Sequence, residues 1–180
     1  MNRQLRPKLL QLKPGTRVVA HDYSMGEWDP DEERTLLVPE KTVGDPGKSY
    51  VYFYLVPARV AGRWESEIAA SGGKPVSWQF SFEQNFQRVH GTARIGGREL
   101  PLPHFRVAGE RIAFNLAVPA GSNSVTHRFS GWVKGDAIEG TVTVGDGSGQ
   151  RVMPWRAKLL ERGKMQMGAS GATVVADGAR

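Results

Sequence analysis

Apolar residues recur first at helical spacing and then at strand spacing along this chain. Leu5, Leu9 and Leu12 lie at i, i+4 and i+7, which predicts one face of a short helix. The sequence Lys-Pro-Gly at 13–15 ends that helix, because proline cannot continue it and glycine permits a turn. Residues 18–20 then form a continuous apolar run, which predicts a strand covered on both faces, as in a parallel sheet.

Two further strands are predicted at residues 34–38 and 50–56. The segment between them contains Gly-Asp-Pro-Gly, a sequence typical of turns, so the two strands are expected to pair antiparallel. Tyrosines at 50, 52 and 54 alternate with apolar residues, which predicts that both faces of the second strand are covered.

From residue 76 onward the pattern has period two with frequent turns. Trp78, Phe80 and Phe82 share one face of a predicted strand, and a change of parity before Val89 predicts a turn near Asn85. The pattern V-x-G-[DE]-x-I occurs at 107–112 and again at 133–138, and each copy predicts a hairpin. About seven short strands would make an antiparallel meander, closed like a barrel or folded as a sandwich.

The predicted fold is therefore mainly β, with a short α/β portion at the N-terminus. The predicted units are residues 1–64, a connector at 65–75 that contains Ser-Gly-Gly, an antiparallel β domain at 76–162, and a disordered tail at 163–180.

Composition and charge narrow the function classes. The 180 residues contain no cysteine, which excludes disulfides, thiolate catalysis and cysteine-ligated zinc. The formal net charge is +6, and the basic residues cluster near both ends of the chain. No nucleic-acid recognition motif accompanies this charge, so a solvated surface is the preferred interpretation over nucleic-acid binding. No apolar run approaches the length of a membrane span, and no secretory signal core is present.

The N-terminal third carries a resemblance to a known family. Residues 5–28, LRPKLLQLKPGTRVVAHDYSMGEW, resemble the LKPG-and-strand segment late in the Rossmann-like domain of bacterial class I S-adenosylmethionine-dependent methyltransferases. Residues 50–58 resemble the strand that follows in that family. The family's cofactor signature lies well before the LKPG segment, and only twelve residues precede Lys13. The resemblance therefore implies that residues 1–64 are the C-terminal part of a Rossmann-like domain, in a truncated methyltransferase inactive by itself.

The same resemblance sets the expected cofactor, partners and location. The full-length family uses S-adenosylmethionine, whereas this chain alone is expected to bind no cofactor. The methyl acceptor is not identified. Exposed apolar strands predict self-association or association with a separate N-terminal half. A cytoplasmic location is the default for the chain, and a periplasmic one follows if a longer form carries an export signal.

The catalytic candidates are His21 and Asp22, which follow the strand at 18–20. Ligands of open α/β sheets bind beyond the carboxyl ends of strands, and a histidine beside a carboxylate can act as a base. Neighbouring strand residues point to opposite faces, so a purely structural role for the pair is the preferred alternative. Tyr23 and Trp28 are candidates for a substrate pocket, although Trp28 could equally close the edge of the domain.

Two other features predict no chemistry. The run GDGSG at 145–149 precedes a strand-like segment rather than a helix, so a hairpin loop is expected there and not a cofactor turn. His90, His104 and His127 lack metal-ligand spacing, and no metal site is predicted.

A second function class remains open from the sequence. The repeated hairpins and the aromatic face at residues 78–82 suit an autonomous β-sheet module that binds a small ligand or a protein partner.

Overall fold

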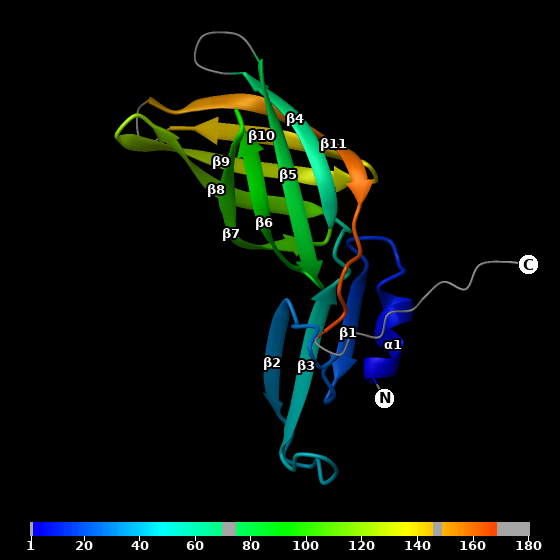
Figure 1. Ribbon diagram of the computed structural model, residues 1–180. Helices are drawn as coiled ribbons and strands as arrows, with labels where there is room; N and C mark the ends of the chain where they lie inside the picture. Colours follow the sequence, from blue (N-terminus) through cyan, green and yellow to red (C-terminus); the bar gives the residue numbers. More distant parts are fainter. Residues whose placement is uncertain (1, 70–74, 146–148, 169–180) are drawn as a thin grey trace, which may run out of the picture.

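The computed structural model describes residues 2–69, 75–145 and 149–168. These residues form one short helix, a three-stranded sheet and a closed eight-stranded barrel, with the small sheet below the barrel in the view of Figure 1. The helix is α1 (Asn2–Leu9), and the small sheet contains β1 (Arg17–His21), β2 (Glu32–Leu37) and β3 (Lys48–Leu55). The barrel strands are β4 (Gly62–Ala69), β5 (Pro75–Asn85), β6 (Arg88–Ile95), β7 (Arg98–Ala108), β8 (Arg111–Ala120), β9 (Asn123–Lys134), β10 (Ala137–Val144) and β11 (Arg151–Arg162).

The small sheet has the strand order β1-β3-β2, and both strand pairs are antiparallel. Tyr52 and Tyr54 of the central strand β3 and Val18 of β1 lie on the face that packs against Leu9 and Leu10 at the end of the helix. The prediction that residues 34–38 and 50–56 pair antiparallel is confirmed.

The predicted α/β portion is wrong. A Rossmann-like remnant needs parallel strands flanked by helices, whereas all pairs between the described strands are antiparallel and the one described helix has eight residues. The error began with the apolar run at 18–20. Val19 is 65% exposed while Ala20 is buried, so β1 is covered on one face only. Three residues are too few to distinguish a run covered on both faces from an alternating one.

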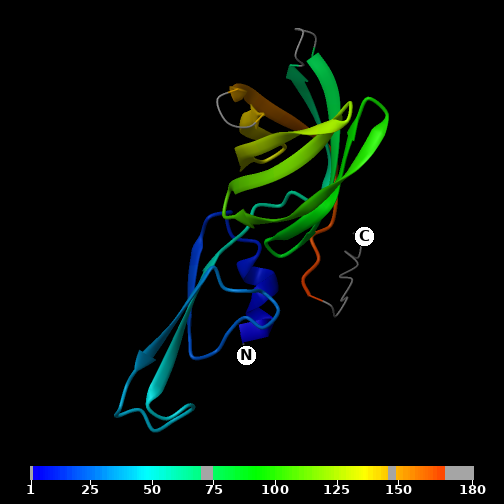
Figure 2. The same ribbon diagram turned by 90° about the vertical axis from the view of Figure 1, so that its left-hand side faces the viewer.

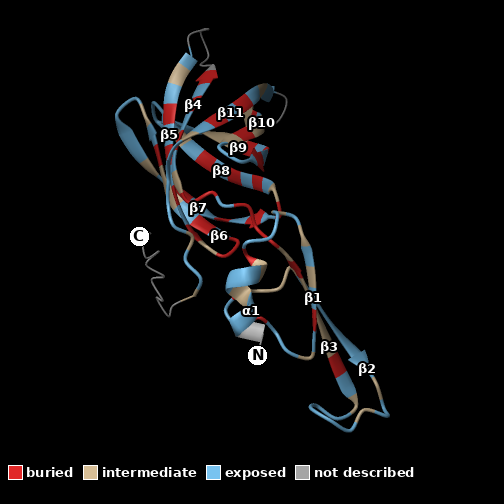
Figure 3. Cartoon of the chain, turned by 90° about the vertical axis from the view of Figure 1, so that its right-hand side faces the viewer, coloured by how far each residue is buried: buried red, intermediate tan, exposed pale blue. Residues whose placement is uncertain are grey.

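The barrel is an up-and-down meander in which each strand pairs with its neighbours in sequence and β11 closes onto β4. Buried and exposed residues alternate along its strands, most clearly in β5 (Figure 3). The mainly β, antiparallel prediction is therefore confirmed, and the barrel rather than the sandwich is formed.

Both copies of the repeated motif form hairpins, as predicted. Val107 pairs with Ile112 across the turn at Gly109, and Val133 pairs with Ile138 across the turn at Gly135. Gly109 has a φ of 58°, a left-handed conformation that glycine adopts without a steric penalty.

The predicted connector, loop and tail can each be compared with the residues that the structure describes. The predicted connector at 65–75 overlaps β4, which pairs with β5 and β11, and residues 70–74 lie outside the described residues. β10 and β11 pair on either side of the predicted loop at 145–149, of which residues 146–148 are likewise not described. Of the predicted disordered tail, residues 163–168 are described, and Gln166 bonds to the backbone at Gln84 and Phe86.

The turn predicted near Asn85 is confirmed, and it joins the barrel to the small sheet. Phe86 lies between β5 and β6 with a φ of 51°, and its ring stacks on Trp28 at a centroid distance of 6.2 Å. Phe86 is thereby a buried member of the small sheet's core. A positive φ at a bulky residue is strained, and this packing is what compensates the strain. This contact links the small sheet to the end of the barrel that lies next to it (Figure 2).

Candidate functional site

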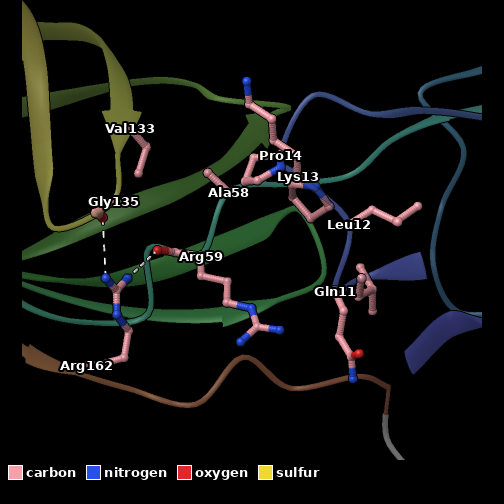
Figure 4. A pocket seen from close by; sticks show the side chains of 11 residues that line it. Gln11, Leu12, Lys13, Pro14, Ala58, Arg59, Val133, Gly135 and Arg162 are labelled. Carbon is pink, nitrogen blue, oxygen red and sulfur yellow. Dashed lines mark hydrogen bonds between the residues drawn. The ribbon is translucent and has the colours of Figure 1, made fainter. Parts of the chain in front are cut away.

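A pocket lies where the segment after α1 meets one end of the barrel (Figure 4). Its volume is about 510 Å³, and it is open to solvent. Three stretches of chain and one strand end line it: residues 10–14, residues 57–59, the β9–β10 turn with Val133 and Gly135, and Arg162. Leu10, Pro57, Ala58 and Val133 are buried and give the pocket an apolar floor.

Three basic residues, Lys13, Arg59 and Arg162, reach this pocket from separate segments of the chain. Arg162 is held firmly at the end of β11. Its guanidinium donates to the backbone oxygens of Arg59 (2.8 Å) and Gly135 (3.3 Å) and contacts the carboxylate of Asp136. The same guanidinium lies 6.0 Å from the ring centroid of Trp64.

Arg59 and Lys13 differ from Arg162 in having no acidic partner within the described part of the chain. Both side chains are exposed, and neither forms an ion pair with a described residue. Since Asp136 neutralises much of the Arg162 charge, Arg59 and Lys13 supply the net positive charge at the pocket.

The backbone that carries Arg59 is fixed by buried polar contacts. The Gln84 side chain, itself buried, bonds to the backbone on both sides of Arg59, at Ala58 and Val60. The Trp64 indole N–H donates to the Val60 oxygen at 2.8 Å. Arg59 therefore extends from a rigid segment, so little backbone entropy is lost when its side chain binds a ligand.

An apolar floor with basic residues at its edge can bind an anion that carries an apolar body. The guanidinium of Arg59 can donate two hydrogen bonds to a carboxylate or a similar group. Within the described residues, no group of three or more histidines and carboxylates has the arrangement of a metal site.

The predicted catalytic pair lies elsewhere, at the end of β1. Asp22 has a φ of 59°, and its carboxylate accepts hydrogen bonds from Lys41 Nζ (2.7 Å) and from the Tyr50 backbone N–H (3.0 Å). The Lys41 hydrogen bond is the main reason that the pKa of Asp22 lies below its usual value. His21 is exposed, with Nδ1 3.7 Å from the Asp22 carboxylate. The contacts of Asp22 join β1, β3 and the loop between β2 and β3, and the catalytic role of the pair stays a prediction.

The two residues predicted to line a substrate pocket, Tyr23 and Trp28, differ in their exposure to solvent. Tyr23 is 70% exposed, whereas Trp28 is completely buried in the small sheet's core, 5.1 Å from the ring of Tyr54. Neither lines the pocket described above.

The aromatic face predicted at residues 78–82 points into the barrel, where rings fill the interior. Phe114 stacks on Phe105 at 4.9 Å and on Phe129 at 4.7 Å, and Phe129 meets Trp155 at 4.9 Å. These side chains form the barrel's core, so the ligand space lies outside the barrel at its end.

Sequence reasoning missed Arg59 because a single arginine after a strand gives no signal. The clusters of basic residues at both chain ends were a usable signal, since Lys13 and Arg162 meet at one pocket. The sequence alone does not show that the fold brings the two ends of the chain to the same pocket.

The fold and the pocket define the class: a mainly β protein with a filled, closed antiparallel barrel and a basic pocket at one end of it. No family model, no curated protein and no solved structure matches the chain. Together with the antiparallel architecture, this overturns the interpretation as a truncated Rossmann-like methyltransferase. The descriptions of the chain as a methyltransferase and as Rossmann-like are therefore wrong.

The described part of the chain contains no helix with the length and apolar character needed to cross a membrane.

Proposed function

We propose that this protein is a binding module whose ligand is a small amphipathic anion, an apolar body that ends in one carboxylate or similar group. The observation that carries this proposal is that Lys13, Arg59 and Arg162 all line one pocket with an apolar floor. The pocket volume of about 510 Å³ falls within the range of roughly 300–1,000 Å³ common for small-molecule sites.

The charge balance at the pocket favours one negative group over several. Arg162 is already bonded to Asp136, which leaves Arg59 as the arginine able to form a new bidentate pair. The apolar part of the ligand would lie against Leu10, Pro57 and Val133, where removing apolar surface from water gives affinity. Solvent reaches the open side of the pocket and screens the ion pair, so affinities in the micromolar range or weaker are expected.

The test uses three probes with one apolar chain and different head groups: octanoate, octan-1-ol and octylammonium. Each is titrated into the full 180-residue chain by calorimetry, with amide chemical shifts to locate the site. We expect octanoate to bind best, octanol more weakly and octylammonium least, with shift changes at residues 57–59 and 133–135. Equal binding of octanoate and octylammonium would refute the proposal.

A matched pair of variants assigns the charge. Arg59→Gln should weaken octanoate binding about ten-fold, the effect of losing one charged hydrogen-bond donor, and should leave octanol unchanged. Arg98→Gln, at the exposed first residue of β7, is the control and should change neither. If Arg59→Gln binds octanoate as tightly as the parent protein, the octanoate site is not at Arg59.

A further inference from the structure

The small sheet has one covered face and one uncovered face. Val18, Ala20, Tyr52 and Tyr54 belong to the core that α1 covers. The alternate residues on the same strands point the other way, and the apolar ones among them are Val19, Leu36, Val51, Phe53 and Leu55. None of these five belongs to either hydrophobic core of the described residues.

Several apolar side chains on this second face are exposed to solvent. Val19 is 65% exposed and Leu36 is 48% exposed, while Val51, Phe53 and Leu55 on the central strand are partly exposed. All six residues of β2 are exposed (Figure 3). A contiguous apolar face of this kind on a folded protein marks an interaction surface.

The charges at the edge of the face are arranged as a pair. Glu32 and Arg34 are two residues apart on β2, so they point to the same side, and Arg34 Nη2 lies 3.4 Å from Glu32 Oε2. Strand register puts Val19, Phe53 and Glu32 in one row across the sheet, and His21, Val51 and Arg34 in the next row.

When this face packs against the same face of a second copy, one row can contact the other row with matching apolar and charged residues. A two-fold axis in the plane of contact, perpendicular to the strands and midway between the rows, places Phe53 of one copy on Val51 of the other. The same axis places Glu32 of each copy opposite Arg34 of the other copy, so the interface contains two such pairs of opposite charge. An interface of this symmetry is isologous and closes as a dimer.

We propose that this face of the small sheet is a dimer interface and that its occupant is a second copy of this chain. The three strands have five, six and eight residues, which at about 3.4 Å per residue and 4.8 Å between strands makes roughly 300 Å² per copy. Such an area is below that of standard protein interfaces, so the dimer is weak and reversible, with a micromolar dissociation constant. The pocket near Arg59 plays no part in this inference.

Sedimentation of the full chain over a range from about 5 to 500 µM tests the proposal. The expected result is a shift from monomer to dimer with rising concentration. Val51→Glu should abolish the dimer, because it buries an unpaired carboxylate against Phe53 of the second copy, on the central strand of the face. Val152→Glu, at a residue of β11 that is 63% exposed on the barrel's outer surface, is the matched control and should leave the dimer unchanged.

Charge variants test the symmetry itself. Glu32→Arg alone and Arg34→Glu alone each place like charges opposite each other twice, and each should weaken the dimer at least ten-fold. Mixing the two single variants makes both contacts attractive again, so a heterodimer should form at concentrations where neither variant dimerises alone.

Three outcomes would overturn the proposal: a monomer at every concentration, association that Val51→Glu does not affect, or no heterodimer in the mixture. A monomer would leave the face to a different protein. Circular dichroism of each variant establishes that the fold is intact before sedimentation is compared.

Discussion

The side-chain amide of Gln84 donates a hydrogen bond of 2.9 Å to the backbone oxygen of Ala58, 26 residues earlier in the sequence. The same amide donates to Phe86, and its oxygen accepts from the backbone N–H groups of Val60 and Ala61. One buried glutamine therefore fixes the crossing from the small sheet into the barrel.

Replacing Gln84 with leucine should lower the free energy of unfolding by about 3 kcal/mol, because two N–H and two carbonyl groups lose buried partners. Urea denaturation measures the change. Gln79→Leu, at an exposed position on the same strand, is the control and should shift stability by less than about 0.5 kcal/mol. Equal losses in the two variants would show that the Gln84 contacts contribute little.

Phe114 should be among the most sensitive residues of the barrel. Its ring contacts those of Phe105, Phe129, Phe80 and Trp155. Phe114→Ala leaves a cavity at this cluster and should cost about 3–5 kcal/mol. Thermal or urea unfolding gives the value, with Asn115→Ala as the exposed neighbour for comparison. A cost below about 1 kcal/mol would mean that the interior collapses around the cavity.

Gly140 should tolerate no side chain. It pairs with Gly131 on β9, and a Cβ built on it would lie 2.0 Å from the Ser130 oxygen. Gly140→Ala must therefore separate β9 from β10, at a cost of about 3 kcal/mol. Gly149→Ala, which meets nothing within 4 Å and lies at ordinary φ, is the control and should be close to neutral. Amide exchange of β9 and β10 measures the local opening, and unchanged protection there would contradict the prediction.

His127 should make the protein less stable in mild acid. Burial lowers the pKa of His127 from its ordinary value of 6.5, although the hydrogen bond with the Val125 oxygen opposes the shift. Below pH 6.5 the unfolded chain binds this proton more readily than the folded one, so stability falls as pH falls, by at most about 1.4 kcal/mol per unit.

The measurement is urea unfolding of the parent and of His127→Phe at pH 7.5 and pH 5.5. His21, His90 and His104 are present in both proteins, so their contributions cancel in the comparison. The variant should lose less stability between the two pH values than the parent. An identical loss would show that His127 is not responsible.

Local pattern was sufficient for the barrel's hairpins. Val107 and Ile112 flank a glycine turn in both sequence and structure, because a two-residue turn sets the register of its hairpin directly. The parity change before Val89 predicted a turn near Asn85 for the same reason, because a regular strand keeps its buried residues at alternate positions, and the turn lies at residues 86–87. These features depend on contacts between residues close in sequence.

The N-terminal third shows where local pattern was insufficient. Residues 18–20 were interpreted as part of a parallel sheet, yet β1 pairs antiparallel with β3 and leaves Val19 exposed. The direction of a neighbouring strand and the presence of a covering layer depend on residues more than thirty positions away. A short apolar run carries neither piece of information.

By itself the sequence determined the strand-forming segments, the glycine turns and the side of each barrel strand that is apolar, because side-chain alternation and turn chemistry are local. Only the tertiary structure decided that β11 closes onto β4, which buries the aromatic residues inside a barrel. The same closure brings Arg162 beside Arg59, 103 residues earlier, at the pocket's edge. Such long-range contacts depend on how all the strands pack together, and that arrangement is not encoded in any single segment.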